Sequence, residues 1–289
     1  MNRLMKKYFI YLALMFTSMV LFVVPLLLLF AFSITDEKSL LENGLKIIPE
    51  VISFSAYEVL FNNFDKYFSL VTFTFIQATV STVSSLFVMA LGAYVLSREQ
   101  YFFSRVTNAV VFGAYFLKWG FVAAFYINTR VLNLYDSIFI YILPNLVDIF
   151  FLLVLKSYYS KIGKTILRSA QMDGAGEMKT FTNIALPMSF PLILAVGILL
   201  FIYRWNDWFT SMLYINESSL YTLQYYLQRA NREEEFIRSM VRITAGSDLA
   251  HGMPIYTMRF AMGVISTIPL LFLTPLFKKA TTYCNFSLE

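Results

Sequence analysis

Six long apolar segments alternate with polar ones along the chain. A helix that crosses a hydrocarbon core of about 30 Å needs roughly 20 predominantly apolar residues. The backbone of such a segment must satisfy its own hydrogen bonds, which favours helices over open strands. The pattern therefore predicts an all-α integral membrane protein with six transmembrane helices. These helices are expected near residues 8–32, 67–96, 106–127, 138–158, 188–209 and 255–277.

The composition agrees with a bilayer environment. Of the 289 residues, 58% are hydrophobic and only 14% are charged, whereas soluble domains carry about a quarter charged residues. Cys284 is the single cysteine, so the chain has no internal disulfide framework. The formal net charge is +5, which raises the question of an acidic partner such as nucleic acid.

The placement of the charges answers that question. An even number of crossings places both termini on one side of the membrane, and Lys and Arg gather on the cytoplasmic side. The segments on the side of the termini hold 12 basic and four acidic residues, whereas those on the opposite side hold 10 basic and 13 acidic residues. Both termini are therefore predicted to be cytoplasmic, and no nucleic-acid partner is needed to explain the basic balance.

The first apolar segment also resembles the start of a secretory signal peptide, because Arg3, Lys6 and Lys7 precede it. The run at 8–32 is, however, longer than the roughly 7–15 apolar residues of a signal-peptide core. Its removal would leave five crossings and spoil the charge asymmetry. We therefore expect residues 1–7 to be a cytoplasmic N-terminus and residues 8–289 to form a single transmembrane domain.

Two polar segments are expected outside the cytoplasm. Residues 33–66 include an amphipathic stretch at 51–61 whose apolar face is predicted to lie against the bundle or in the membrane interface. Residues 210–254 form a longer loop rich in Arg and Glu. This loop is consistent with a solvated helical hairpin and with a docking surface for a soluble partner, and the pattern leaves both open.

The cytoplasmic loop at 159–187 is predicted to fold as a helical hairpin. Asp173 is expected to end the first short helix and to cap the second one, and Gly174 supplies the backbone freedom for the bend. Met178 and Phe181 fall on one face of the second short helix. Apolar side chains exposed in this way usually mark a protein contact, so we predict that the hairpin binds a cytoplasmic protein.

The spacing within this hairpin is specific. It reads Ala170-x3-Gly174-x9-Ile184-x-Leu186-Pro187, with Asp173-Gly174-Ala175 followed by Phe181. This spacing resembles the cytoplasmic signature loop of the membrane subunits of bacterial ABC importers, and its details resemble the carbohydrate branch of that family. Residues 94–98 also agree with the family, and residues 205–208 with 220–223 are similar to permeases for large or decorated oligosaccharides. One position departs: the family usually has an acidic residue where this chain has Arg168.

The resemblance implies the type I ABC importer fold of the maltose permeases and a place in the bacterial cytoplasmic membrane. It implies a permease subunit for a carbohydrate, in particular an oligosaccharide. Its partners would be a homologous second permease, an ABC ATPase dimer and an extracytoplasmic solute-binding protein. The coupling residues that it implies are Arg168, Ser169, Ala170, Asp173, Gly174, Ala175, Met178, Phe181, Leu186 and Pro187.

No enzymatic chemistry is expected in this chain. It has no Gly-rich phosphate loop of the Walker type, so no cofactor is predicted here, and ATP and Mg²⁺ would bind to the partner ATPase. An ABC permease for a peptide, polyamine or phosphate is one alternative. A self-sufficient secondary transporter is another, but such proteins tend to show paired broken helices, which the sequence does not display.

Ionisable and amide residues near the membrane segments are candidates for the translocation path. Lys118 and Asp148 lie inside predicted helices, and Asn145, Asn206 and Asp207 lie toward their outer halves. Intramembrane charges usually face a cavity or a partner helix. An ion pair between Lys118 and Asp148 that only stabilises packing is the competing interpretation, and both remain open.

The remaining polar and aromatic candidates are weaker. Trp205 and Trp208 have the chemistry to stack on sugar rings, but the aromatic belt at membrane interfaces also explains them and is the interpretation we favour. His251 has no second His and no Cys nearby, so no metal site is predicted.

Overall fold

The computed structural model describes residues 3–44, 46, 48–98, 102–116, 120–162, 169–170, 172, 174–229, 232, 255–271, 275 and 278. Within them the secondary structure is almost wholly helical, and the only β feature is an isolated bridge between Thr35 and Ile52. The chain divides into two compact units, one formed by residues 1–68 and 226–269 and the other by residues 69–225 and 270–289. Each unit has its own packing.

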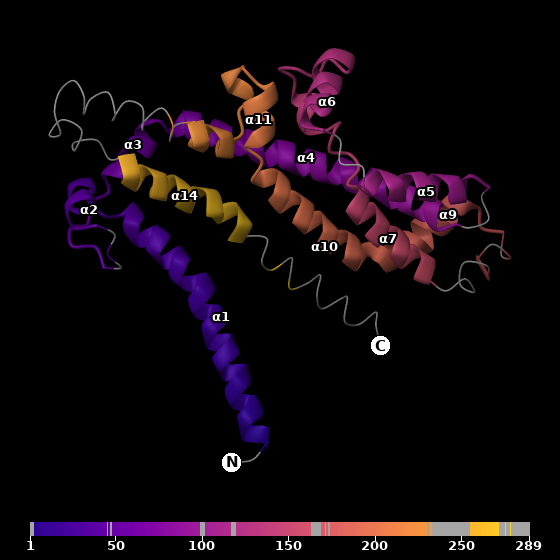
Figure 1. Cartoon of the computed structure of the whole chain (residues 1–289), viewed down its shortest axis with the longest axis horizontal. Coiled ribbons are helices and arrows are strands. Elements are labelled where there is room, and N and C mark those ends of the chain that lie inside the picture. The colour runs from indigo at the N-terminus through magenta and orange to yellow at the C-terminus, as the bar shows by residue number, and fades with distance from the viewer. Residues whose placement is uncertain are drawn as a thin grey trace. The chain divides into compact units, whose positions relative to one another are not determined.

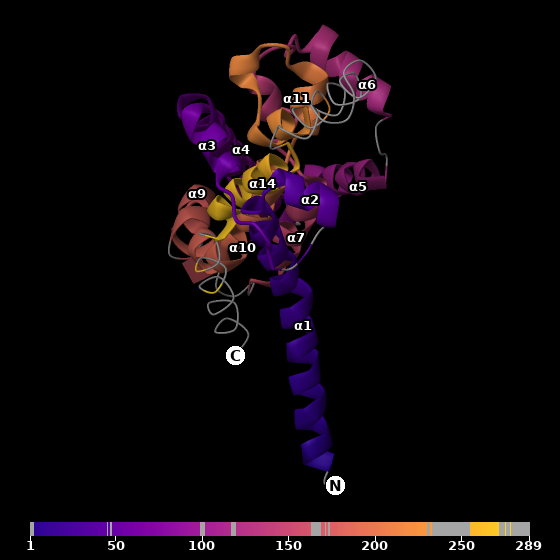
Figure 2. The ribbon, with the colours of Figure 1, turned by 90° about the vertical axis from the view of Figure 1, so that its left-hand side faces the viewer.

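Among the described residues, the first unit includes α1 (Arg3–Ser33), α2 (Glu37–Asn43), α3 (Ser55–Asn62), α14 (Ile255–Leu271) and the first turn of α4 (Phe64–Ser97). The end of α1 packs on α14, where the rings of Phe32 and Phe260 lie 5.1 Å apart. The rest of α1 runs clear of α14 (Figures 1 and 2) and exposes apolar side chains on every side. A helix that is apolar all round suits a lipid environment.

A buried carboxylate fixes the start of α14. Glu37 is 4% exposed, and its Oε1 accepts a hydrogen bond from the Tyr256 amide at 3.0 Å. Its Oε2 accepts bonds from the amide and the hydroxyl of Thr257, both at 3.0 Å. The first amides of a helix lack intrahelical partners, and a negative charge there is favourable. These hydrogen bonds join α2 to α14, although the bonded residues are more than 200 positions apart in the sequence.

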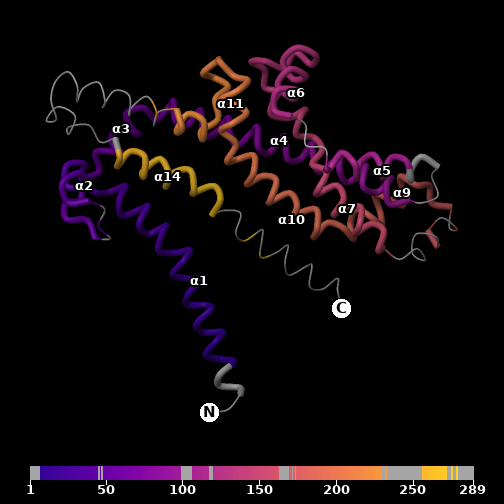
Figure 3. Tube along the Cα trace, in the orientation of Figure 1, coloured from indigo at the N-terminus to yellow at the C-terminus, as the bar shows by residue number. Residues whose placement is uncertain are grey.

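The second unit contains the remainder of α4 and most of the other elements. They are α5 (Phe102–Phe116), α6 (Phe121–Tyr126), a π-helical turn η1 (Ile127–Val131), a 3₁₀ turn η2 (Ile138–Tyr141), α7 (Ile149–Lys161), α9 (Glu177–Thr180), a π-helical turn η3 (Phe181–Ala185), α10 (Leu186–Trp205), α11 (Phe209–Tyr214) and a 3₁₀ turn η4 (Ser218–Leu220). Figure 3 follows their order along the chain.

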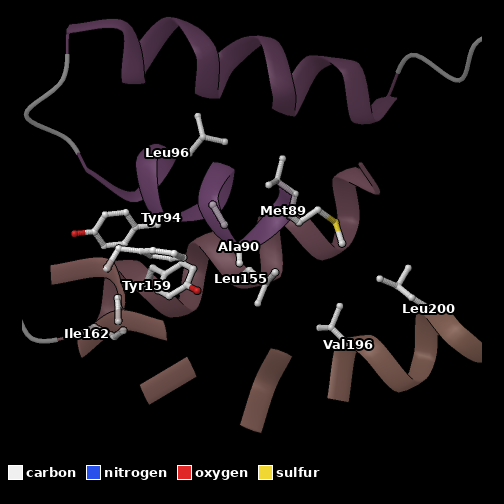
Figure 4. Packing of buried hydrophobic residues seen from close by; sticks show 13 residues of the cluster. Met89, Ala90, Tyr94, Leu96, Leu155, Tyr159, Ile162, Val196 and Leu200 are labelled. Carbon is white, nitrogen blue, oxygen red and sulfur yellow. The ribbon is translucent and has the colours of Figure 1, made fainter. Parts of the chain in front are cut away.

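The core of this unit lies where α4, α7 and α10 meet. Its buried side chains include Met89 and Ala90 of α4, Leu155 of α7 and Val196 of α10, and Figure 4 shows them facing one another. The absence of a side chain at Gly197 allows α10 to approach α4 closely. A Cβ added at Gly197 would lie only 2.9 Å from Leu86 Cδ1 of α4. Such small-residue contacts are typical of helix packing in membranes.

Buried hydroxyl groups of α4 bind backbone groups in short segments between the longer helices of this unit. The Ser81 hydroxyl donates to the Tyr141 carbonyl at 2.9 Å. The Ser85 hydroxyl lies 3.0 Å from the Asn145 carbonyl and 2.8 Å from the Leu146 carbonyl, and the Thr74 hydroxyl accepts the Leu223 amide at 2.8 Å. Irregular backbone in an apolar region is stable only where protein groups satisfy it, and α4 supplies them.

The expected crossings are confirmed only in part. Among the described residues, three helices are long and apolar enough to span a membrane, namely Lys7–Ser33, Phe64–Ser97 and Glu177–Trp205. They correspond to the expected crossings at 8–32, 67–96 and 188–209. A fourth span is present if the bent pair Val106–Phe116 and Phe121–Val131 is counted as one. The structure thus confirms a helical, multi-span protein, but not the full count of six.

Two crossings expected as single helices are wrong in detail. The segment at 106–127 is bent by 114° between α5 and α6. The segment at 138–158 is not one helix, because α7 begins only at Ile149. The Asp148 carboxylate caps it there by accepting the Phe151 amide at 3.2 Å. Pro144, which cannot continue a helical hydrogen-bond ladder, lies in the irregular stretch before it.

One further helix end differs from expectation. The fifth helix ends at Trp205 instead of 209, and Asp207 accepts the Phe209 and Thr210 amides at the start of α11. The last helix, α14, is described over Ile255–Leu271; most of residues 272–277 lie outside the described residues, so the expected end at 277 stays a prediction. In the 51–61 stretch, Leu60 is buried as expected, whereas Phe54 and Phe61 are exposed.

We predict that Ser85→Ala lowers the stability of the purified protein. The change removes the hydroxyl donor to the Asn145 and Leu146 carbonyls, and an unsatisfied buried polar group costs about 1–3 kcal/mol. The apparent melting temperature in mild detergent, followed by size-exclusion chromatography, measures the loss. Thr79→Ala is the matched control, because the exposed Thr79 hydroxyl bonds only to Phe75 one turn earlier in α4. Equal melting temperatures for the two variants would contradict the structural role given to Ser85.

Candidate functional site

The bend of the hairpin expected at 159–187 depends on Gly174. Its φ is +80°, a left-handed conformation that costs other L-residues about 1–2 kcal/mol. The Ala175 amide donates to the Ala170 carbonyl at 2.9 Å, the six-to-one hydrogen bond that closes many helix ends behind such a glycine. A Cβ at Gly174 would meet no atom within 4 Å, so the requirement for glycine is conformational. The expected bend is confirmed.

The N-cap of the second short helix lies three residues after Asp173. It is Gly176, whose backbone is extended, and the Gly176 carbonyl accepts the Thr180 amide at 2.9 Å. Arg168 and Asp173 lie outside the described residues, so the capping expected of Asp173 and a contact of either residue with an ATPase stay predictions.

The apolar side chains of the hairpin divide into an exposed set and a buried set. Met172 is 90% exposed and Met178 is 67% exposed. Phe181 is only 5% exposed, with its ring centroid 5.1 Å from that of Tyr94 and 6.5 Å from that of Tyr159. The expectation that Met178 and Phe181 form one exposed face is therefore wrong, because the core of the second unit takes up the Phe181 ring.

A polar cluster fastens α9 to the end of α4. We call the three residues Tyr94, Arg98 and Glu177 the α4–α9 clamp. The Tyr94 hydroxyl donates to Glu177 Oε2 at 2.8 Å, and Arg98 Nη2 lies 3.1 Å from the same oxygen. Arg98 Nη2 also donates to the Tyr94 hydroxyl oxygen at 2.6 Å, and its guanidinium stacks over the Tyr94 ring at 4.9 Å. The Arg98 side chain is only 12% exposed, so the pair is partly desolvated and less screened by salt than a surface ion pair.

Sequence reasoning missed this clamp, although a signal was present. Tyr94 and Arg98 lie four residues apart at the end of a predicted helix and share one face. The partner Glu177 is distant in sequence, and no local pattern identifies it.

The hairpin runs without a break into the fifth helix. α9, η3 and α10 together form a continuous helix over Glu177–Trp205, and the Leu186 amide bonds to the Phe181 carbonyl in a π-type turn. Pro187 lacks an amide and would clash with the carbonyl four residues before it, so the wider turn there relieves the clash. Two α7 hydroxyls hold the start of α10: Tyr158 donates to the Met188 carbonyl at 2.7 Å, and Tyr159 lies 2.9 Å from the Ser189 hydroxyl. Leu186 is half-buried and Pro187 is exposed.

The first group of path candidates has mainly structural contacts. Asp148 caps α7, and Asn145 offers its carbonyl to Ser85 and to Arg204 Nη2, the latter at 2.7 Å. Lys118 lies outside the described residues, so its pairing with Asp148 stays a prediction. Arg204, which sequence reasoning missed, is 4% exposed, and its Nη1 has no partner among the described residues.

The second group lines a cavity of about 450 Å³ at the end of α10. Its lining residues are Leu199, Ile202, Tyr203, Asn206, Asp207, Trp208 and Phe209. Trp208 is 38% exposed. Trp205, in contrast, is fully buried and stacks on Phe201, so the interface belt does not explain Trp205.

The described residues contain no group of three or more His, Cys, Asp or Glu side chains placed to hold a metal ion. His251 lies outside them.

No family model matches the chain. Among curated proteins, the polygalacturonan/rhamnogalacturonan transport system permease protein YtcP of Bacillus subtilis is 28% identical over 264 residues, 89% of this chain and 88% of that protein. The trehalose/maltose transport system permease protein MalG of Thermococcus litoralis is 25% identical over 255 residues, 85% of this chain and 79% of that protein.

A solved structure shares the fold. It belongs to a bacterial ABC transporter involved in the import of the acidic polysaccharide alginate, with a TM-score of 0.79 and 24% identity over 96% of this chain and 98% of that one. The chain is thus a helical, multi-pass membrane protein whose homologues are permease subunits of carbohydrate ABC transporters.

Proposed function

We propose that this chain is the membrane-spanning permease subunit of an ATP-driven importer for an oligosaccharide. The observation that carries the proposal is the hairpin, which exposes Met172 and Met178, is clamped to α4 and is continuous with α10. The chain carries no phosphate-binding loop of its own, so the energy of ATP must reach it through contact with another protein. YtcP and the alginate transporter are named for polysaccharide transport, which supports a large carbohydrate as cargo.

The hairpin provides a means of transmitting force. Met172, Met178 and Lys179 are exposed and would contact an ATPase dimer on the cytoplasmic side. Phe181 and the clamp prevent the hairpin from rotating independently of α4 and α7. Closure of the ATPase would then move the hairpin and α10 together as a rigid body. Coupling acts in both directions by thermodynamic linkage. A ligand that stabilises the outward-open permease from the outer side would also stabilise the ATP-bound, closed ATPase on the cytoplasmic side.

The other parts of the proposal follow from this arrangement. A homologous second permease would complete the translocation path, with Lys118, Asn145, Asp148, Asn206 and Asp207 as candidate lining residues from this chain. A soluble binding protein would deliver the cargo on the outer side, and both termini would be cytoplasmic. The relatives do not favour a secondary transporter or a non-sugar permease.

Co-purification tests the proposal. Tagged chain would be extracted from its native membrane in mild detergent and the bound proteins identified by mass spectrometry. We expect a second permease and an ABC ATPase, and ATP hydrolysis in the recovered complex that rises when a loaded binding protein is added. Recovery of the chain alone or as a homo-oligomer, without an ATPase, would reject the proposal.

Gly174→Val should uncouple the complex without dissociating it. A β-branched residue at φ +80° is strongly strained, so the bend should rearrange. In proteoliposomes we expect the stimulation of ATP hydrolysis by the loaded binding protein to fall at least about tenfold, which corresponds to about 1.4 kcal/mol of lost coupling. Gly174→Asn is the matched control, because Asn tolerates left-handed backbone and should retain most of the stimulation. Wild-type coupling in the Val variant would refute the role of the bend.

Charge reversal tests the α4–α9 clamp. Arg98→Glu and Glu177→Arg should each reduce stimulated ATP hydrolysis about tenfold, because like charges would then face each other at the 3.1 Å contact. The double variant should recover to within about threefold of the wild type, since residues in contact couple energetically. Lys161→Glu makes the same charge change at an exposed site on α7 and should have little effect. Additive losses in the double variant would show that the contact does not support coupling.

A further inference from the structure

The cavity at the end of α10 lies at the opposite end of that helix from the hairpin. α10 has 20 residues, and at 1.5 Å per residue it is about 30 Å long, the thickness of a bilayer core. A cavity beside its last turn is therefore at the outer boundary of the membrane if the hairpin is cytoplasmic. Its volume of about 450 Å³ falls within the range of roughly 300–1,000 Å³ common for small-molecule sites.

The lining combines exposed aromatic rings with polar groups. Tyr203 is 73% exposed, Trp208 38% and Phe209 43%, and Asn206 and Asp207 lie between them in the chain. A pyranose ring has an apolar face of C–H groups and a rim of hydroxyls. Aromatic rings complement the C–H face, and carboxylate or amide groups complement the hydroxyl rim. Ligand sites commonly combine apolar walls with a few polar groups in this way.

The Asp207 carboxylate is held in a fixed orientation. Its Oδ1 accepts the Phe209 amide at 3.1 Å and the Thr210 amide at 3.0 Å. The described residues donate no hydrogen bond to its Oδ2. Asn206 is also tethered, because its Nδ2 donates to the Ile202 carbonyl at 2.8 Å. An acceptor that is already oriented loses little entropy on binding a hydroxyl.

The charge of the cavity selects among sugars. Asp207 is the only charged residue among the described ones that line it. Arg204 precedes it in the chain, but its guanidinium bonds to the Asn145 carbonyl and does not line the cavity. A uronate would bring its carboxylate close to that of Asp207, and like charges a few ångströms apart repel.

We propose that this cavity binds one uncharged pyranose ring, which lies against Tyr203 and Trp208 and donates a hydroxyl hydrogen bond to Asp207 Oδ2. The inference rests on the proposed function for the presence of a sugar at this position, and it deepens that function by naming an uncharged sugar unit. The proposed sugar unit is uncharged, whereas the polygalacturonan and alginate named for the related systems are acidic. It also gives Trp208 a role beyond that of an interface anchor.

Ligand-observed saturation-transfer NMR on the nanodisc-embedded complex of both permeases and the ATPase, without the binding protein, tests the proposal. The probes are the methyl glycosides of glucose, galactose and mannose, each paired with its uronate, which differs only in the carboxylate at C6. We expect at least one neutral glycoside to bind, and its uronate to bind about tenfold more weakly. Trp208→Ala should weaken neutral binding about tenfold, or about 1.4 kcal/mol, whereas Trp208→Phe should stay within threefold of the wild type.

Asp207→Asn tests the charge. Asn still accepts amides as a helix cap, so α11 should keep its start while the repulsion disappears. We expect the uronate to bind this variant within threefold of the neutral glycoside. Three results overturn the inference: no neutral glycoside binds a complex that hydrolyses ATP, Trp208→Ala leaves binding unchanged, or uronates bind the wild type at least as tightly. Failure to recover an ATPase at all would instead reject the proposed function, and with it the reason for a sugar at this site.

Discussion

The packing of the hairpin end of the second unit depends on Tyr94. Its ring packs between Tyr159 of α7 and Phe181 of η3, and its hydroxyl bonds to both Arg98 and Glu177. One side chain thus joins α4, α7 and the hairpin through apolar and polar contacts together. If it were absent, the hairpin would keep the direct Arg98–Glu177 contact and the packing of Phe181 on Tyr159, but it would lose the one residue that takes part in both the polar and the apolar contacts. A loop that must transmit movement needs such a support, because a flexible loop would absorb the displacement.

The same helix, α4, supports the opposite part of the unit by a different means. Its buried hydroxyls at Thr74, Ser81 and Ser85 bind backbone groups of Leu223, of η2 and of the irregular stretch before α7. These polar contacts allow irregular backbone to persist beside apolar helices. Near the end of α10, the Gln77 side-chain amide of α4 donates to the Arg204 carbonyl at 3.3 Å, three residues before Asp207 in the cavity lining. α4 therefore contacts both the hairpin and the end of α10 that leads into the proposed sugar site, an arrangement that suits coupling between the two ends of a permease.

Structural features that depend on neighbouring residues could be predicted from the sequence, whereas features that depend on tertiary contacts could not. Gly174 was predictable because an Asp-Gly pair at a helix end has few backbone solutions. The burial of Phe181 was not, since helical spacing places it beside Met178 and only the tyrosines of α4 and α7 draw it inward. The long apolar run at 138–158 concealed a break, because Asp148 caps the start of α7 inside that run. Arg204 and Glu177 have their partners more than 50 residues away, beyond the reach of any periodicity.

The central claim is that the exposed surface of the hairpin docks on an ATPase. The single cysteine, Cys284, makes a direct measurement possible: in a Cys284→Ser background, Met178→Cys is labelled with a benzophenone maleimide and irradiated in native membranes. The account predicts a covalent adduct with an ABC ATPase from Met178, and none from Tyr203→Cys, which is equally exposed but at the far end of α10. Adducts with the ATPase from Tyr203, or none from Met178 in membranes that contain the assembled complex, would contradict it.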